Sequence, residues 1–301
     1  MPSRALPFFV LGAGVVVVSF ASILIRFAQA DGAASLTIAA VRLTLAAAVL
    51  APFAWMRAGH ELLGLGRREL GLCVLSGALL ALHFWTWITS LENTSVASST
   101  ALVTTNPLWV GLASAIFLRE RPGRAAILGI VLCLVGSLLI FAADARRAPG
   151  HALAPMLGNA QALVGAVAAS GYLLMGRAVR ARVSLTAYIW LAYWSAALLL
   201  LALVAIMRVP VFALPEGAWL YMAALALGPQ LIGHTSFNWA LRRLTATFVA
   251  VAILGEPVGA ALLAWLFFGE RFSVLQLIGF VALLGGIFVA AREEKRSAVP
   301  L

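Results

Sequence analysis

The stretch LGEPVGAALLAWLFFGERFSVLQLIGFVALLGGIFVA (254–290) decides the fold, because a second version of it, NPLWVGLASAIFLRERPGRAAILGIVLCLVGSLLIFA, lies at 106–142. The two align without a gap at an offset of 150 residues. The residues matched at this offset include Pro107 with Pro257, Glu120-Arg121 with Glu270-Arg271, Gly129 with Gly279 and Gly136 with Gly286. A proline and a Glu-Arg pair at one shared offset are not expected from apolar composition alone. They indicate a duplication of about 150 residues.

The composition around this stretch is that of a membrane protein. Of 301 residues, 63% are hydrophobic and 11% are charged, whereas soluble domains have about 45–50% apolar and about 25% charged residues. A disordered chain is excluded by the same figures. One bilayer span needs about 20 mostly apolar residues. The apolar segments that could span lie near 7–29, 35–56, 70–91, 94–118, 125–143, 156–177, 185–207, 217–239, 245–268 and 273–291.

Five spans in each copy make the repeat inverted, because an odd number sends the second copy into the membrane from the opposite side. The predicted fold is therefore an all-α polytopic membrane protein with ten transmembrane helices in two inverted-topology repeats of five. Residues 1–150 form the first repeat and residues 151–301 form the second. Such repeats are typical of transporters, whose substrate site lies near the midplane at the repeat interface.

The basic residues behind the net charge of +10 indicate how the chain is oriented in the membrane. No more than two basic residues are adjacent anywhere, so a nucleic-acid partner is not expected. In the predicted topology, fifteen basic residues lie on the side of the two termini and four on the other side. Because basic residues concentrate in cytoplasmic loops, both termini should be cytoplasmic. The expected surroundings are the lipid bilayer.

The two quoted stretches resemble the repeat signature of EamA-type carriers in the drug/metabolite transporter superfamily, and the resemblance covers nearly the whole chain. It implies a multi-pass carrier of the cell inner membrane, usually an exporter of metabolites or amino acids, that works without ATP hydrolysis. Among such carriers, the branch that exports aromatic amino acids is the suspected relative. The resemblance does not imply a particular substrate.

Polar groups deep in the spans are the candidate site residues, because each costs about 2.5–3.5 kcal/mol to insert. Glu256 is the only acidic residue deep in a predicted span, and Asn106 is its repeat mate. Each is followed by a proline, Pro257 or Pro107, which frees a backbone carbonyl and predicts a helix break. In the alternative interpretation, nearby glycines only allow close helix packing and Glu256 bonds to a neighbouring helix.

The third span carries His83 and Trp87 on one helix face, and His83 either contacts substrate, couples protons or fills the core. Arg42 in the second span could bind a substrate carboxylate, pair with Asp31 or Glu256, or snorkel. Trp109 lies one turn beyond Asn106. For each deep aromatic residue, lipid or core packing is the alternative to substrate contact. The predicted substrate-binding residues are His83, Trp87, Asn106, Trp109, Tyr172, Tyr188 and Glu256.

These features predict a secondary transporter that exports amino acids or related small metabolites by alternating access, with aromatic or apolar side chains favoured. The alternatives are a proton-coupled exporter of lipophilic cations, held at Glu256 and aromatic faces, and a channel-like pore. The sequence has no HExxH, P-loop or dinucleotide motif, so no enzyme activity, metal site or cofactor is expected. Besides the small-molecule substrate and the bilayer no partner is expected, and the chain is expected to act as a monomer.

Overall fold

The computed structural model describes residues 5–93, 99, 102–103, 105–113, 115–116, 123–145, 154–268 and 273–297. Within these residues the regular structure is helical and there is no β-strand, which confirms the predicted all-α polytopic fold. The helices are α1 (Leu6–Val18), α2 (Ala21–Ala30), α3 (Ser35–Gly64), α4 (Arg67–Asn93), α6 (Asn106–Ala113), α7 (Arg124–Ala145), α8 (Pro155–Val179), α9 (Leu185–Met207), α10 (Glu216–Leu225), the π-helix η2 (Ala226–His234), α11 (Thr235–Ala240), α12 (Ala246–Ile253), α13 (Glu256–Phe268) and α14 (Val274–Ser297).

Each of the ten apolar segments predicted from the sequence falls on helix in the described part of the chain. Seven helices or joined helix pairs there are long and apolar enough to cross a membrane. Among the segments that the structure describes throughout, three are interrupted: the first is divided into α1 and α2, the eighth into α10, η2 and α11, and the ninth into α12 and α13. The helix of the second segment is longer than predicted, since α3 continues to Gly64.

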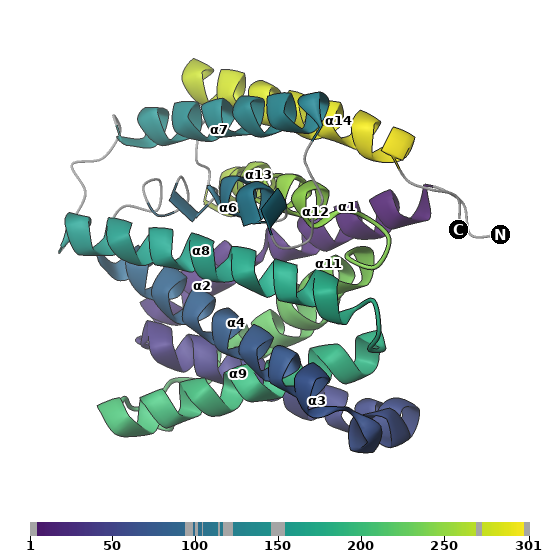
Figure 1. Cartoon of the computed structure of the whole chain (residues 1–301). Coiled ribbons are helices and arrows are strands. Elements are labelled where there is room, and N and C mark those ends of the chain that lie inside the picture. Colours follow the sequence, from purple (N-terminus) through teal and green to yellow (C-terminus); the bar gives the residue numbers. More distant parts are fainter. Residues whose placement is uncertain are drawn as a thin grey trace.

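The helices lie in layers (Figure 1). The pair α7 and α14 forms one outer layer, α6, α12 and α13 lie beneath it, and α3 and α9 lie at the opposite side of the molecule. Between these layers α4 packs along α8, and α1 packs against η2. The start of α1 and the end of α14 lie at the same end of the molecule (Figure 1), as an even number of spans requires.

The outer layer contains an internal two-fold contact. A Cβ atom at Gly136 would lie 2.6 Å from the carbonyl oxygen of Gly279, and one at Gly286 would lie 2.6 Å from that of Gly129. The repeat offset of 150 residues relates Gly129 to Gly279 and Gly136 to Gly286, so it maps the first of these two contacts onto the second. Two repeat-related helices that pack antiparallel in this way cross the membrane in opposite directions, which agrees with the inverted repeat.

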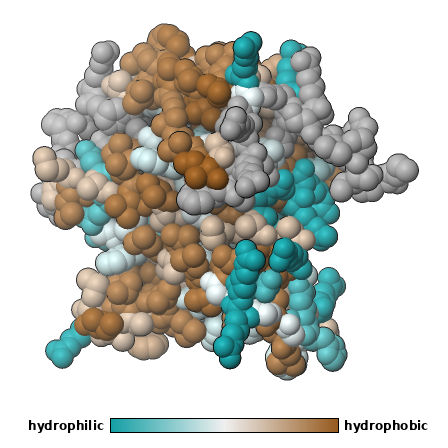
Figure 2. Space-filling view, in the orientation of Figure 1, coloured by the Kyte–Doolittle hydropathy of each residue, from teal (hydrophilic) through white to brown (hydrophobic). Residues whose placement is uncertain are grey.

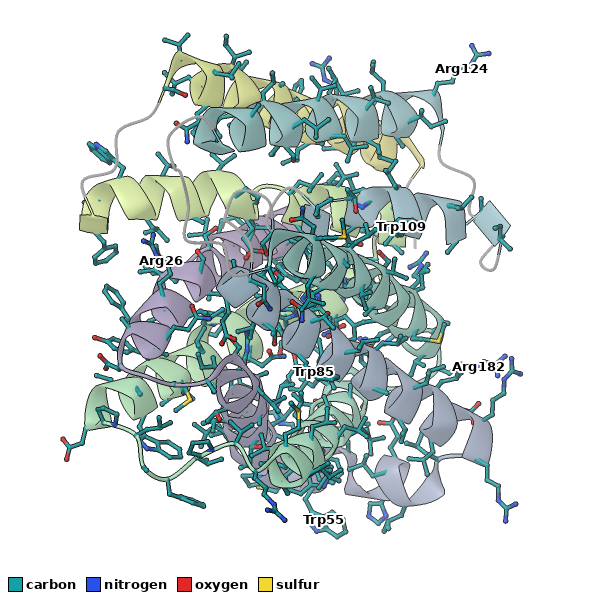
Figure 3. The ribbon with its side chains drawn as sticks, turned by 90° about the vertical axis from the view of Figure 1, so that its left-hand side faces the viewer. Arg26, Trp55, Trp85, Trp109, Arg124 and Arg182 are labelled. Atoms are coloured by element: carbon teal, nitrogen blue, oxygen red, sulfur yellow. The ribbon has the colours of Figure 1, made fainter. Side chains whose placement is uncertain are left out.

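The surface suits a bilayer (Figure 2). Apolar side chains cover most of the described surface in this view, and hydrophilic ones gather at one end, over the ends of α3 and α4. Exposed basic residues at this end include Arg57, Arg67, Arg68 and Arg182. In the view turned by 90°, Arg124, Arg182 and Trp55 project outward, whereas Trp85 lies among the helices (Figure 3).

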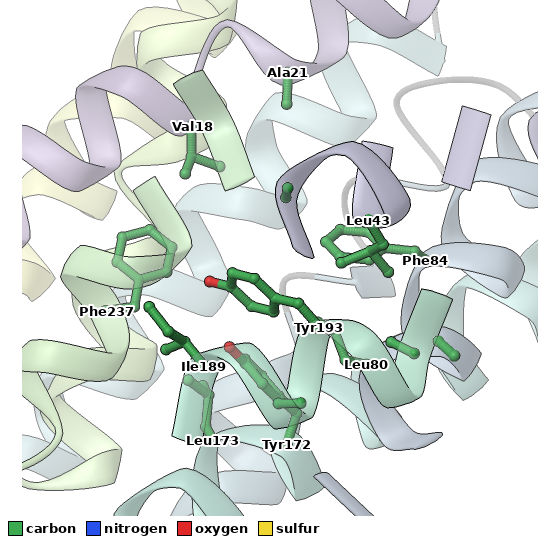
Figure 4. Packing of buried hydrophobic residues seen from close by; sticks show 14 of the residues in the cluster. Val18, Ala21, Leu43, Leu80, Phe84, Tyr172, Leu173, Ile189, Tyr193 and Phe237 are labelled. Carbon is green, nitrogen blue, oxygen red and sulfur yellow. The ribbon is translucent and has the colours of Figure 1, made fainter. Parts of the chain in front are cut away.

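The interior of the lower layers is aromatic (Figure 4). Tyr193 projects from α9 between Phe237 and Phe84, with Tyr172 beside it. Tyr193, Phe84 and Phe237 are each 2% exposed or less. This aromatic core is where α3, α4, α8, α9 and the broken eighth span meet, and it surrounds the polar groups described next.

Candidate functional site

Arg42 of α3 is the charged residue at the centre of the described core, with an exposed fraction of 0%. Its Nη2 atom donates a hydrogen bond of 3.0 Å to Oε1 of Gln230 in η2, and its guanidinium group lies 4.0 Å from the centre of the Phe84 ring. Nε and Nη1 are buried without a hydrogen-bond partner. A buried guanidinium with unused donors is costly unless a further group completes the site.

Gln230 is held in place by the π-helix. In η2 the backbone forms wider turns than in an α-helix, and π-helical segments occur frequently at functional sites. Pro229 lies inside this segment and has no N–H group to continue the α-helical pattern. The hydroxyl group of Tyr193 donates to the Gln230 backbone oxygen at 3.3 Å. Gln230 is fully buried, yet its Nε2 donor has no partner.

Aromatic rings connect Arg42 to both histidines of the core. The Phe84 ring contacts the rings of His83 and His234 at centroid distances of 4.9 and 5.3 Å. The His83 ring is stacked on Trp87, with centroids 5.8 Å apart and planes 4° apart. Nδ1 of His83 lies 3.0 Å from the carbonyl oxygen of Gly165. If Nδ1 donates there, Nε2 of the neutral ring is an acceptor.

Glu256 and Asn106 occupy equivalent places in the two repeats, each at the start of a helix. Glu256 begins α13 and Asn106 begins α6. Ser19 Oγ lies 3.4 Å from the backbone oxygen of Glu256, and Ser170 Oγ lies 3.2 Å from that of Asn106 and 2.6 Å from Asn106 Oδ1. Ser19 and Ser170 are themselves matched in the repeat. Glu256 is half-buried, and its charge acts on Arg42.

The other predicted residues have different surroundings. Tyr172 is buried beside His234, with ring centroids 6.3 Å apart, and Asn238 donates to its hydroxyl group. The Tyr188 hydroxyl is hydrogen-bonded to Ser76 at 2.7 Å. Trp109 is half-buried and donates from Nε1 to Thr105 at 3.1 Å. The structure thus brings Arg42, His83, Trp87 and Tyr172 into one aromatic cluster. The polar atoms of Tyr188 and Trp109 are instead hydrogen-bonded to Ser76 and Thr105.

Gln230 and His234 were not among the residues predicted from the sequence, although both are polar residues inside a predicted span. Nδ1 of His234 is buried without a partner. The pair Pro229-Gln230, followed by His234 one turn later, is the signal that marks this segment. Pairing with Asp31 or Glu256 was one of the alternatives for Arg42, and its hydrogen-bond acceptor in the structure is the neutral amide of Gln230.

Two arginines lie beside the end of α11, on the side of the molecule where the exposed basic residues gather. Arg177 donates to the carbonyl oxygen of Leu241 at 2.6 Å, and Arg180 donates to that of Val183 at 2.6 Å and of Asn238 at 3.4 Å. Cations suit these positions because α11 ends here. Burial lowers the pKa of Arg180 to about 10, which leaves it protonated at neutral pH. Its role is therefore to hold the helix end.

Known proteins resemble this chain over nearly its full length. Residues 7–142 and 156–292 each match the EamA-like transporter family. An uncharacterized transporter of Archaeoglobus fulgidus is 25% identical over 89% of this chain and 90% of its own. The uncharacterized transporter YxxF of Bacillus subtilis is 23% identical over 81% of this chain and 77% of its own. A solved crystal structure with 23% identity has a TM-score of 0.80 and covers 98% of this chain and 99% of the other; it shows the fold alone.

Proposed function

This chain belongs to the EamA-like transporter family, and from that premise we propose that it is a secondary carrier that exports amino acids or related small metabolites, with aromatic or apolar side chains favoured. That it is a membrane transporter follows from the family. The substrate class and the mechanism are the proposed part.

The observation that carries the proposal is the combination of unused polar groups with aromatic walls. Arg42, Gln230, His234 and Trp87 each have a buried donor or acceptor atom without a partner. A hydrophobic site with a few unsatisfied polar groups is the usual form of a small-molecule site. The surrounding rings of Phe84, Tyr172 and Phe237 favour a substrate with a flat or apolar side chain.

Burial of the site supports a carrier over a pore. Arg42 and Gln230 are 0% exposed, so a substrate reaches them only after the surrounding helices move. A pore would keep a hydrated path to its polar groups. In an inverted repeat, the required movement is an exchange of shape between the two halves, which is alternating access.

Orientation and location complete the proposal. The exposed basic residues at the end where α1 begins and α14 ends support cytoplasmic termini by the positive-inside rule, and the carrier would then lie in the cell inner membrane. We propose that it acts as a monomer, without enzyme activity, cofactor or nucleic-acid partner.

A lipophilic cation is the competing substrate, because Glu256 could attract it. The buried cation of Arg42, which interacts electrostatically with Glu256, disfavours it. The two substrates are separated by Glu256→Gln. If the protein exports cations, this variant abolishes cation resistance in cells and spares amino-acid efflux.

The function is tested with purified protein in liposomes preloaded with labelled phenylalanine, tryptophan or leucine, with and without a pH gradient. We expect efflux and counterflow of at least one amino acid, and slower efflux in His83→Ala and Trp109→Ala. Trp55→Ala is the matched control, because Trp55 is 62% exposed and projects outward. If no amino acid moves under any gradient, the proposed substrate class is wrong.

A further inference from the structure

We propose that Arg42 and Gln230 together form the receptor for a carboxylate group of the transported substrate. This inference rests on the proposed function and names the chemical group by which the substrate is held. Three donor atoms of these residues, Nε and Nη1 of Arg42 and Nε2 of Gln230, are buried and have no hydrogen-bond partner.

The geometry of the guanidinium group keeps one complete binding edge free. A guanidinium has two edges that can hold a carboxylate, Nε with Nη2 and Nη1 with Nη2, and Nη2 carries one hydrogen for each. Gln230 takes one of the two Nη2 hydrogens. Since neither Nε nor Nη1 is used, the edge that Gln230 does not occupy retains both of its donors. Two parallel donors are the arrangement that carboxylates prefer.

Phe84 packs against the same guanidinium group, and the centre of its ring lies 4.0 Å from Cζ of Arg42. The N–H donors of a guanidinium lie in its plane, so a carboxylate is bound at an edge of the group and not above it. The Gln230 amide, oriented by its own bond to Arg42, presents its Nε2 hydrogens beside the same guanidinium. Together these atoms make an anion site whose donors are fixed by neighbouring packing.

The charge of Arg42 also needs an anion. A charged group taken out of water is costly unless it is paired and hydrogen-bonded, and the acceptor it has is a neutral amide. Glu256 acts on it electrostatically, but it makes no hydrogen bond to Nε or Nη1. A substrate carboxylate supplies both the missing charge and the missing acceptors. Glu256 then remains available for a positive group on the same substrate.

The test compares acids with their amides, which have nearly the same shape but lack the negative charge. Thermal unfolding of the purified full chain is followed with L-phenylalanine, L-leucine or phenylacetate, and with L-phenylalaninamide, L-leucinamide or phenylacetamide. We expect at least one acid to raise the unfolding midpoint, and its amide to have at least tenfold weaker affinity, since a hydrogen bond to a charged group contributes about 1.5–3 kcal/mol.

Two substitutions locate the effect. Arg42→Lys keeps the charge but removes the fork, and Gln230→Glu places a permanent carboxylate beside Arg42. Both should weaken acid binding about ten- to hundredfold and remove the preference for acid over amide. Because Gln230→Glu provides a counter-ion within the protein, it should fold even if Arg42→Lys does not. Arg26→Lys, at an exposed position of α2, is the matched control and should bind like the unaltered chain.

The outcomes separate this inference from the proposed function. Equal stabilisation by acid and amide, no stabilisation by any acid, or an unchanged acid preference in Gln230→Glu overturns the carboxylate receptor. If amino acids and their amides are both transported in liposomes, the proposed function stands and the receptor does not. If no amino acid is transported in liposomes, the proposed substrate class is wrong, and this result is independent of the binding measurements on acids and amides.

Discussion

The third and eighth spans are the same helix in the two repeats, yet they differ in shape. In the first repeat α4 is continuous from Arg67 to Asn93, whereas in the second repeat the span is divided into α10, η2 and α11. The first and sixth spans differ in the same way, since α1 and α2 are separate and α8 is continuous. The broken spans pack on each other, α1 with η2 and α2 with α10, and the straight spans α4 and α8 pack on each other.

This difference teaches that one repeated sequence pattern supports two conformations within a single molecule. The outer pair α7 and α14 remains symmetric, because its glycine contacts are exchanged by the repeat offset. Two unlike pairs beside a symmetric pair are consistent with the proposed exchange of shape between repeats. The candidate site combines both kinds of span, since Gln230 comes from the broken span and His83 and Phe84 come from the straight one.

The largest expected effect is on the break itself. Replacing Pro229 by Ala restores a backbone donor in η2 and should favour an α-helix by about 3 kcal/mol. The eighth span would then resemble α4, and Gln230 would rotate away from Arg42. We expect slower amide hydrogen exchange over residues 226–234 and loss of transport in liposomes.

Pro52→Ala is the matched control for this prediction. Pro52 lies inside α3, which stays helical through it, and its side chain is exposed. Its replacement should leave amide exchange in η2 and transport unchanged. If Pro229→Ala transports at the normal rate and its amide hydrogen exchange is unchanged, the break in the eighth span is not needed for function. The difference between the third and eighth spans then has no role in transport.

The next effect concerns the symmetric outer pair. A Cβ at Gly286 would lie 2.6 Å from Cys133 Sγ and 2.6 Å from the Gly129 backbone oxygen, whereas one at Gly285 would meet nothing within 4 Å. Gly286→Ala should therefore lower the free energy of unfolding, measured by titration with a denaturing detergent, by about 1–3 kcal/mol. Gly285→Ala, its neighbour in the same helix, should be neutral or slightly stabilising.

Gly136→Ala sharpens the same prediction, because its Cβ would lie 2.6 Å from the Gly279 backbone oxygen. A symmetric interface requires that the two repeat-related substitutions have similar costs. A large cost at one position and none at the other would show that α7 and α14 are not equivalent in the membrane.

The sequence predicted much of this fold for a physical reason. Hydrocarbon requires long apolar helices, so composition alone locates the spans, and Pro107, Pro257 and the paired glycines carry the repeat. Breaks within spans were harder to predict. Pro52 and Pro229 are both prolines inside apolar helices, but only the second interrupts its helix, because packing against neighbouring helices decides which carbonyl groups stay unpaired.

One numerical signal of the break was present. The repeat offset is 149 residues at Ser35-Leu36-Thr37, matched with Ser184-Leu185-Thr186, and 150 residues at Leu91, matched with Leu241. The second copy thus has one more residue in this interval, and a π-helix is one place that can hold an extra residue. Gln230 and His234 were not among the residues predicted from the sequence, because they become conspicuous only when folding brings them to Arg42 and Phe84.

The smallest expected effect distinguishes the serines that support the two helix starts. Ser170 lies 2.6 Å from Asn106 Oδ1, and Asn106 is 9% exposed, so Ser170→Ala leaves a buried acceptor without this donor and should cost about 1 kcal/mol or more. Ser19 reaches across to its partner helix only at the Glu256 backbone oxygen, at 3.4 Å. Because that contact is long, Ser19→Ala should cost about 0.5 kcal/mol.

Both costs are measured as free energies of unfolding, and a double-mutant cycle with Asn106→Leu isolates the side-chain bond, with an expected coupling of about 0.5 kcal/mol or more. Equal costs for the two serines would mean that only the shared contact to the backbone oxygen matters. A larger cost at Ser170 would show instead that the first repeat fixes its helix start by a side chain. In the second repeat the matched serine, Ser19, bonds to the backbone oxygen of Glu256 and not to its carboxylate.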